Sequence, residues 1–260
     1  MKILITGAHG YIGRSLCNNF EHTHEVYPIT RNVMDLTNSR EVRNYFEDTY
    51  FDVVIHCASV GGHREDMDGV DVLDNNLSMY FNLLENKEHF GKFINFGSGA
   101  ELNSLYTPYG LSKRVIRQSI LEKENFYNIR IFAVFDENEL NSRYIKTNVQ
   151  KYINGEALEV FYAKKIDFFY MKDLITVVKY YISNNTIPQE FDCTYSETKS
   201  LLNIAKIINL LGDYRREINF NNEPSPDYCG NYYDLGLKYV GMEEGIVNTY
   251  NKLKITAISL

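Results

Sequence analysis

A glycine-rich turn near the N-terminus, TGAHGYIG, restricts the fold more than any other segment of this chain. It follows an apolar run, Lys2–Thr6, that predicts a buried strand, and it precedes a helix-like stretch, Tyr11–Phe20. Glycine tolerates positive φ and lets backbones approach closely, and the first N–H groups of a helix can bind a phosphate. This context predicts a dinucleotide site, although three glycines also occur in plain surface turns. The candidate cofactor residues of the turn are Gly7, His9, Gly10, Tyr11, Ile12 and Gly13.

Short apolar runs alternate with helix-like stretches through the first half of the chain. The expected strands are Lys2–Thr6, Glu25–Thr30, Asp52–Cys57, Lys92–Gly97 and Asn128–Val134. The expected helices are Tyr11–Phe20, one capped by Asn38 or Ser39 and ending at Glu47, Val72–Glu88 and Pro108–Glu124. This alternation predicts right-handed βαβ units, and therefore an α/β fold with a Rossmann-like doubly wound parallel sheet. Ligands of such sheets bind at the carboxyl ends of strands, where Gly7–Gly13, Arg31–Asp35, Ala58–Gly62 and Ser98 lie.

The second half of the chain has a less regular pattern. We expect helices at Ile145–Asn154, Lys172–Ser183, Leu201–Leu211 and Glu243–Lys252. Short strands are expected at Leu158–Tyr162 and Glu190–Cys193, with a proline-containing loop at Asn221–Tyr228. We therefore predict a dinucleotide-binding domain over residues 1–135 and a smaller, mainly substrate-binding part over residues 136–260, with some segments returning to the Rossmann core.

The composition excludes several classes of function. The net charge of −7 makes nucleic acid a poor partner, because a duplex-binding protein usually has a basic face. We expect neither a membrane span nor a signal peptide, and hence a cytoplasmic protein. The four cysteines, Cys17, Cys57, Cys193 and Cys229, are scattered and are expected to be free thiols rather than metal ligands.

Tyr109 and Lys113 form a YxxxK pair at the start of an expected helix. The i, i+4 spacing places both side chains on one helix face, where the ammonium is expected to lower the pKa of the phenol. Ser98 follows a strand and is suited to polarise a carbonyl by donating a hydrogen bond. The motif also arises by chance, as Tyr195/Lys199 and Tyr250/Lys254 illustrate, but only Tyr109 follows a strand-end serine in the dinucleotide-binding half.

These motifs together resemble the NAD-dependent epimerase/dehydratase family, the extended short-chain dehydrogenase/reductases that act on nucleotide sugars. TGAHGYIG, DVVIHCAS, FGSG and YGLSK occur in the family's order, and IDFFYMKDL resembles a later family segment. Within the family, the stretch from TRNVMDL to CASVGG is similar to GDP-L-fucose synthase. The resemblance implies a homodimer, a nucleotide-sugar substrate and a catalytic triad of Ser98, Tyr109 and Lys113. It also implies cofactor contacts from Arg31, Asp35, Leu36, Cys57, Ala58, Ser59, Asn76, Tyr109 and Lys113.

Arg31 bears on the choice of cofactor. A Rossmann protein selective for NAD usually has an acid at the end of the second strand, to accept a hydrogen bond from the ribose 2′-hydroxyl. Here the nearest residue is Arg31, and the first acid is Asp35. A guanidinium suits a 2′-phosphate, so we expect NADP, with NAD as the alternative and a solvated Arg31 as the plain interpretation.

Several departures from the family pattern narrow the expected chemistry. The residues that match the acid/base groups of GDP-L-fucose synthase are Ala100 and Arg143, and alanine cannot transfer a proton. Glu101 lies one position too late for a dehydratase acid, and we interpret it as a loop acid. Ile166 replaces a diphosphate-binding arginine, for which Lys164 or Lys165 could substitute. The loop from Ser98 to Tyr109 is short, and Ala133 and Asp136-Glu137 replace family residues, so a reshaped sugar pocket is expected.

The leading hypothesis is an NAD(P)H-dependent reductase of a nucleotide-linked 4-keto-6-deoxy sugar. The first alternative is a nucleotide-sugar 4-epimerase with tightly bound NAD. The second is a dinucleotide-binding protein without catalysis. The histidines His56, His63 and His89 are expected to be structural or surface residues, and no metal site is expected.

Overall fold

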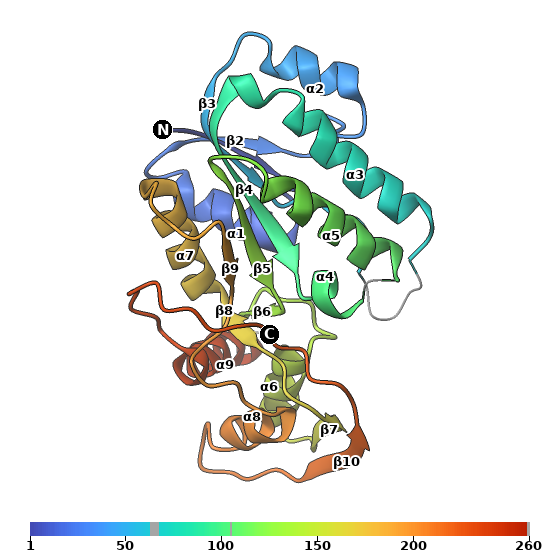
Figure 1. The fold of residues 1–260 in the computed structure, drawn as a ribbon. Coiled ribbons are helices and arrows are strands. Elements are labelled where there is room, and N and C mark those ends of the chain that lie inside the picture. The colour runs from blue at the N-terminus through green and yellow to red at the C-terminus, as the bar shows by residue number, and fades with distance from the viewer. Residues whose placement is uncertain (63–67, 105, 259–260) are drawn as a thin grey trace. The chain divides into compact units, whose positions relative to one another are not determined.

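The computed structural model describes residues 1–62, 68–104 and 106–258, with the last three of these as backbone only. His63 lies outside the described residues. The chain divides into two compact units (Figure 1). The first unit contains Met1–Ile131 and Val178–Phe191, and the second contains Phe132–Val177 and Asp192–Leu260. A short segment thus returns to the first unit after the chain has entered the second.

The first unit is built on a six-stranded sheet with the strand order β2-β1-β3-β4-β5-β9. These strands are β1 (Lys2–Thr6), β2 (Glu25–Ile29), β3 (Phe51–His56), β4 (Phe90–Ser98), β5 (Phe126–Ile131) and β9 (Glu190–Asp192). The pairs β1/β2, β1/β3, β3/β4 and β4/β5 are all parallel. The predicted Rossmann-like α/β fold is therefore confirmed. The strand order reverses between β1 and β3, which makes their carboxyl ends the switch point of the sheet.

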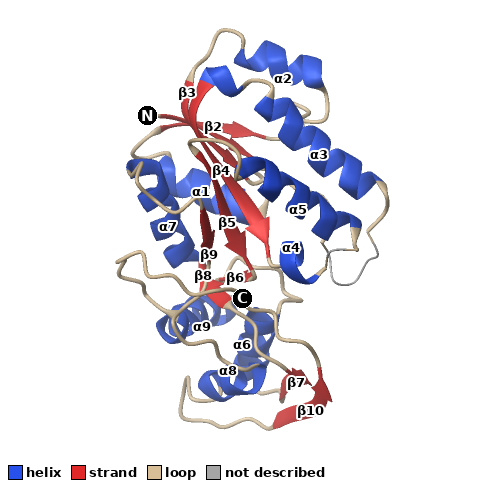
Figure 2. Cartoon of the chain, in the orientation of Figure 1, coloured by secondary structure: helices blue, strands red, loops and turns tan. Residues whose placement is uncertain are grey.

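Helices cover both faces of this sheet. Figures 1 and 2 show α3 and α5 side by side on one face, and α1 and α7 on the other. The helices attached to the sheet are α1 (Tyr11–Phe20), α2 (Ser39–Phe46), α3 (Asp71–Leu84), the short α4 (Ala100–Asn103), α5 (Pro108–Ile120) and α7 (Met171–Ser183). A single 3-10 turn, η1 (Lys87–His89), precedes β4. Asn38 is the N-cap of α2, because its side chain accepts hydrogen bonds from the N–H groups of Arg40 and Glu41.

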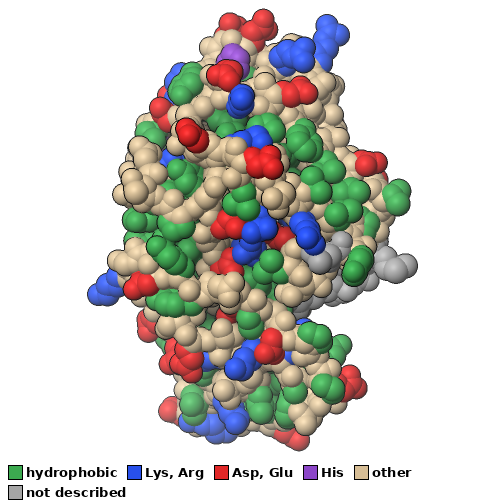
Figure 3. All heavy atoms as spheres, viewed as in Figure 1, with side chains coloured by type: hydrophobic (Ala, Val, Ile, Leu, Met, Phe, Trp, Pro, Cys, Tyr) green, Lys and Arg blue, Asp and Glu red, His purple; other side chains and the backbone are tan. Residues whose placement is uncertain are grey.

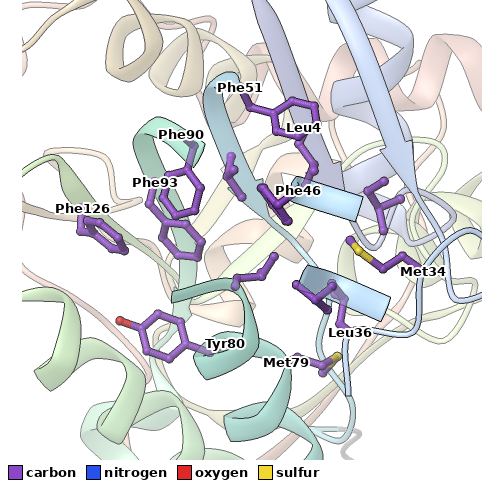
Figure 4. Close-up of a cluster of buried hydrophobic side chains, with 14 of the residues drawn as sticks. Leu4, Met34, Leu36, Phe46, Phe51, Met79, Tyr80, Phe90, Phe93 and Phe126 are labelled. Carbon is purple, nitrogen blue, oxygen red and sulfur yellow. The ribbon is translucent and has the colours of Figure 1, made fainter. Parts of the chain in front are cut away.

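Aromatic rings dominate one core cluster of the first unit (Figure 4). The rings of Phe93 and Phe126 stack with their centroids 5.0 Å apart, and Phe46 meets Phe51 edge to face at 5.4 Å. Each fully buried side chain of this size contributes about 1.5–3 kcal/mol. These rings come from β3, β4, β5 and α2, and Leu4 of β1 belongs to the same cluster, so one continuous core holds both strands that end at the switch point.

Among its described residues, the second unit contains two small parallel pairs, three complete helices and the first part of α7, Met171–Val177. β7 (Leu158–Ala163) pairs with β10 (Ile218–Pro224), and β6 (Ala133–Phe135) pairs with β8 (Phe168–Tyr170). The helices are α6 (Tyr144–Asn154), α8 (Leu201–Ile208) and α9 (Met242–Ile258). Figure 3 shows acidic and basic side chains interspersed over the visible face of the molecule. No helix among residues 1–62, 68–104 and 106–258 combines the length and apolarity that a membrane crossing requires.

Several predicted elements need correction. Among them, the helix expected to reach Glu124 ends at Ile120, and the helix expected to reach Leu211 ends at Ile208. The strand expected at Asn128–Val134 is two strands, because the backbone changes partner at Phe132: Gly99 N donates to Ile131 O, and Ala133 N donates to Asp167 O. The loop expected at Asn221–Tyr228 is wrong in its first part, since β10 extends to Pro224. The helix expected to reach Glu88 ends at Leu84, and α9 continues six residues beyond Lys252, to Ile258. β8 was not predicted, because three apolar residues have no period of their own.

Candidate functional site

The Thr6 hydroxyl joins the two strand ends at the switch point. Its oxygen accepts hydrogen bonds from the N–H groups of Cys57 and Ala58, both at 3.1 Å, and lies 2.9 Å from His56 Nδ1. A hydroxyl has one hydrogen and two acceptor sites, so it donates to Nδ1 and the imidazole carries its proton on Nε2. Burial, together with a smaller effect of the Lys113 charge, lowers the pKa of His56 to about 3. His56 is therefore a neutral structural residue, as expected.

The glycine turn is as tight as the motif predicts. Gly7 has φ +63°, and a Cβ there would lie 2.8 Å from Ala58 N. A Cβ at Gly13 would overlap the carbonyl oxygen of Gly7. Gly10 is the N-cap of α1, with no side-chain cap and no acid in the first turn. A helix N-terminus of this kind carries a partial positive charge and fits a pyrophosphate.

A cavity of about 240 Å³ opens beside the glycine turn within the first unit. The candidate cofactor residues that line it are Gly7, Gly10, Arg31, Asp35, Leu36, Cys57, Ala58 and Ser59. Met34 and Val60 also line it and lie within the strand-end segments singled out from the sequence, whereas sequence reasoning missed Ile29, Thr30 and Met79, for which no motif gives a signal. Apolar walls with a few polar groups suit the adenosine part of a dinucleotide. His9, Tyr11, Ile12 and Gly13 lie on the adjoining turn and helix start rather than in the lining.

Asp35 and Arg31 occupy the end of this cavity after β2. Thr37 donates to Asp35 Oδ1 from its N–H at 3.0 Å and from its hydroxyl at 2.8 Å. These two hydrogen bonds are the largest causes that lower the pKa of Asp35; the Arg31 charge adds a smaller effect, while burial opposes them. Asp35 is therefore an anion held by its own turn. Arg31 is exposed at the rim, where it can meet a phosphate.

The structure brings Ser98, Tyr109 and Lys113 together. Thr107 caps α5 by accepting from Gly110 N at 3.0 Å, and Pro108 lies in the first turn of the helix. Lys113 Nζ donates to Phe96 O at 2.9 Å and lies 5.6 Å from the centroid of the Tyr109 ring. The Tyr109 side chain hydrogen-bonds to Ser98 and Ser59. Since Ser59 also lines the cavity, the phenol lies at the edge of the candidate cofactor site.

The expected pKa of Tyr109 needs correction. Burial raises it, the carboxylates of Glu101 and Asp68 raise it further, and the hydrogen bonds from Ser98 and Ser59 lower it. The expectation of a net lowering by Lys113 is wrong, because burial disfavours the phenolate. Burial also lowers the pKa of Lys113 to about 8, against the opposing effects of Glu101 and Cys57.

Asn76 organises the loop that follows β3. Its Nδ2 donates to Val60 O at 3.0 Å and to Ser112 Oγ at 3.1 Å, and its Oδ1 accepts from Val60 N at 2.9 Å. Ser112 Oγ in turn donates to Tyr109 O at 2.7 Å. Both amide hydrogens of Asn76 are thus donated within the protein, and its contact with a cofactor stays a prediction.

Gly62 is a site residue whose role sequence reasoning missed. Its φ is +73°, and a Cβ there would lie 2.8 Å from Cζ of the Tyr109 ring. Gly61, at φ +79°, would instead meet the side chains of Asp68 and Val72. The paired glycines of SVGGH were the available signal.

Glu101 is not the loop acid expected from the sequence. It lies in the first turn of α4, and its side chain is fully buried. Its Oε1 accepts from Ser98 N at 2.8 Å, and its Oε2 lies 3.4 Å from Arg130 Nε. The expectation failed because burial here depends on β5, which is distant in sequence.

The remaining candidates lie in the second unit. Lys164 stacks on Tyr162 at 5.4 Å, Ile166 is buried, and Arg143 is the N-cap of α6. Tyr195 donates to Asp173, and Lys199 pairs with Glu197 and Glu243, so this YxxxK pair has other partners. A substrate contact from Lys164 or Lys165 stays a prediction. The four cysteines are free thiols, and the described part of the chain has no group of three or more His, Cys, Asp or Glu side chains placed to hold a metal ion.

Comparison with known proteins adds to this geometry. Residues 3–193 match the model of the NAD-dependent epimerase/dehydratase family. The chain is 26% identical over 263 aligned residues to a CDP-abequose synthase from Yersinia pseudotuberculosis, covering 88% of this chain and 92% of the relative.

Two solved structures have similar folds. A GDP-mannoheptose C4 reductase from Campylobacter jejuni with NADP bound superposes with a TM-score of 0.79 at 17% identity, covering 97% of this chain and 98% of that one. A UDP-glucose 4-epimerase from Thermotoga maritima gives a TM-score of 0.80 at 16% identity, covering 99% and 100%. At these identities the two superpositions establish the fold and leave the reaction open.

Proposed function

The chain belongs to the NAD-dependent epimerase/dehydratase family, and we propose that within this family it is a reductase of a nucleotide-linked 4-keto-6-deoxy sugar. Tyr109, with its pKa raised and two serine hydroxyls beside it, carries this proposal. A phenol that keeps its proton at neutral pH is suited to give it to a carbonyl oxygen. The activity stated for the C4 reductase and the synthase with which the chain aligns supports a sugar-nucleotide substrate.

The proposed reaction divides its work among three side chains. NADPH, when bound, would supply a hydride to the keto carbon and would itself be oxidised to NADP⁺. Tyr109 gives its proton to the carbonyl oxygen, so that the C=O group becomes an alcohol. Ser98 donates a hydrogen bond to the same oxygen and polarises it. Lys113 holds its charge beside the Tyr109 ring and stabilises the phenolate that remains until solvent restores the proton.

The neighbouring residues favour reduction over epimerisation at C3 or C5 and over elimination of water. Both of those reactions need a further group that takes a proton from a ring carbon. Ala100 cannot do so, and the Glu101 carboxylate is already occupied by Ser98 N, Asn128 and Arg130. Hydride transfer needs no such group.

The test is incubation of the purified protein with NADPH and a panel of CDP-, GDP-, UDP- and dTDP-linked 4-keto-6-deoxy sugars. Loss of NADPH absorbance and a product two mass units heavier than the substrate are expected for one of them. Tyr109→Phe is the matched control, since it keeps the ring and removes only the hydroxyl group that carries the proton. No oxidation with any member of the panel would reject the proposal.

We also propose that NADPH is preferred to NADH. The only support is Arg31, which lines the rim of the cavity where a 2′-phosphate would lie. Arg31→Ala should weaken binding of NADPH by about 10-fold, the loss of one charge-assisted contact, and leave NADH binding within twofold. Equal weakening of both cofactors would show that Arg31 does not discriminate between them.

The two alternatives are separated by simple measurements. A 4-epimerase uses the same three residues in both directions and retains NAD, which mass analysis of the purified protein would detect. A protein that only binds the dinucleotide would show no change on Tyr109→Phe in any assay. A homodimer and a cytoplasmic location remain predictions, the first of which sedimentation would test.

A further inference from the structure

Four charged side chains form a partly buried cluster next to Ser98 of the candidate active site. Glu101 Oε2 lies 3.4 Å from Arg130 Nε and 3.7 Å from Arg117 Nε. Glu190, from β9, accepts from Arg130 Nη2 at 2.7 Å and from Arg117 Nη2 at 2.6 Å. The Glu101 side chain has no exposed surface, whereas that of Glu190 is 27% exposed. The inner carboxylate is thus on the side of Ser98 and the outer one near solvent.

Residues of β4 and β5 accommodate the buried Glu101 carboxylate. A Cβ at Gly97 would lie 2.1 Å from Glu101 Oε1 and 2.7 Å from Asn128 Nδ2, so only glycine at this point of β4 permits the arrangement. Asn128 Nδ2 lies 3.3 Å from both carboxylate oxygens, and the amide of Asn95 donates to Asn128 Oδ1 at 2.7 Å. An unpaired buried carboxylate is costly, and this one is surrounded by donors. Burial raises the pKa of Glu101, while Arg130, Ser98 N, Asn128 and Lys113 oppose it.

The same carboxylate is in direct contact with the catalytic strand end. Its Oε1 accepts from Ser98 N at 2.8 Å, and Ser98 Oγ accepts from Ala100 N at 3.2 Å. The short helix α4 therefore holds the Ser98 backbone and hydroxyl from one side. Gly110 allows α5 to pack against α4, since a Cβ there would overlap Ser104 O.

We propose that Glu101 is a positioning residue that fixes Ser98 and keeps the Tyr109–Lys113 pair protonated, so that the site is set to give a proton rather than to take one. This inference rests on the proposed reductase function. A buried phenol and a buried ammonium respond in opposite ways to burial, but an anion next to both favours the protonated form of each. One carboxylate thereby sets the direction in which the proton moves.

Other charged groups also face the pair. Asp68, from the segment before α3, acts on Tyr109 in the same direction as Glu101. Cys57, after β3, faces Lys113, and His56 beside it is neutral. Arg117 and Arg130 face Glu101 itself and are compensated by Glu190. Among these groups Glu101 alone acts on both Tyr109 and Lys113.

The test compares Glu101→Gln with Glu190→Gln. Both variants remove one negative charge from the same cluster and keep the side-chain volume, but Glu190 is not among the groups that act on Tyr109 or Lys113. The rate of keto-sugar reduction should fall at alkaline pH as the pair loses its proton. In Glu101→Gln this fall should move to lower pH by about one unit, the effect of one charge near the pair in a partly screened site. Glu190→Gln should keep the wild-type profile.

A second readout needs no substrate. Lysines labelled with 13C at Cε report the protonation of Lys113 by NMR, with Lys113→Met identifying its signal. The midpoint of the Lys113 titration should fall by about one pH unit in Glu101→Gln and stay unchanged in Glu190→Gln.

If the wild-type protein reduces no keto sugar, the proposed function fails while this titration still decides the role of Glu101. A folded Glu101→Gln with unchanged midpoint and pH profile would overturn the inference, as would equal shifts in both variants. If Glu101→Gln does not fold, a wild-type Lys113 midpoint below pH 7 would overturn it and one above pH 7 would support it.

Discussion

Replacing Gly62 by alanine should displace Tyr109 without adding or removing a charged side chain. The backbone at Gly62 has φ +73°, a conformation that costs an alanine about 1–2 kcal/mol. The added Cβ would lie 2.8 Å from Tyr109 Cζ, well inside an ordinary contact distance, and also near both Cε atoms of the ring. The ring must therefore move by a large fraction of an ångström, and its hydroxyl with it.

The expected loss of activity follows from this displacement. A shift of about 1 Å in a catalytic group can cost about 100-fold in rate, so kcat should fall by about 10- to 100-fold. The free energy of unfolding should fall by about 1–3 kcal/mol from the backbone strain and the contact together. Steady-state kinetics with NADPH and the active keto sugar measure the first, and urea unfolding measures the second.

Gly61→Ala is the matched control for this variant. Gly61 has φ +79°, so the backbone strain is the same, but its Cβ would meet Asp68 and Val72 rather than Tyr109. It should lose similar stability and retain most of its kcat. If Gly62→Ala keeps kcat within twofold of the wild type, or if both variants lose kcat equally, the reasoning about the Tyr109 contact is wrong.

Three further predictions concern single side chains. Lys92 Nζ donates to the carbonyl oxygens of Tyr181, Ile182 and Asn184 at 2.6, 3.3 and 2.7 Å. Lys92→Ala should therefore lower the free energy of unfolding in urea by about 2–4 kcal/mol, whereas replacing the exposed Lys87 by alanine should lower it by under about 0.5 kcal/mol. Equal effects of the two substitutions would refute the stabilising role of these three hydrogen bonds. Tyr109→Phe should lower kcat by about 100-fold or more and leave the Kd for NADPH, measured by fluorescence titration, within threefold of the wild type. A loss of NADPH affinity as large as the loss of kcat would assign Tyr109 to cofactor binding instead. The pKa of His56 is lowered to about 3, so below pH 6.5 the unfolded chain binds a proton that the folded chain does not bind. The free energy of unfolding should therefore fall by about 2 kcal/mol between pH 7 and pH 5, relative to that of His56→Asn. Parallel pH profiles of stability for the two proteins would contradict this.

Much of the first unit could be predicted because its signals are local. The glycine turn, the strand before it and the helix after it are contiguous, and the bounds of β1 and α1 match the prediction. The spacing from Tyr109 to Lys113 is likewise a property of one helix. The proximity of Ser98 to both was predictable only because parallel strands end at one edge of a sheet.

The misses have a common physical cause. The partner change at Phe132 depends on which strand lies next to Ala133, and nothing in the residues 128–134 encodes that. The burial of Glu101 depends on Gly97, Asn128 and Arg130, which belong to two strands. The pKa of Tyr109 depends on its enclosure, which the i, i+4 spacing to Lys113 cannot report.

The return of residues 178–191 to the first unit has a consequence for how the protein is made. A ribosome releases the glycine turn and the Tyr109–Lys113 pair long before it releases Glu190, which pairs with Arg117 and Arg130. Until then two guanidinium groups have only Glu101 as a buried carboxylate partner within this cluster. Nascent chains halted near residue 140 should therefore remain sensitive to protease, and chains halted after enough residues to free Phe191 should become resistant.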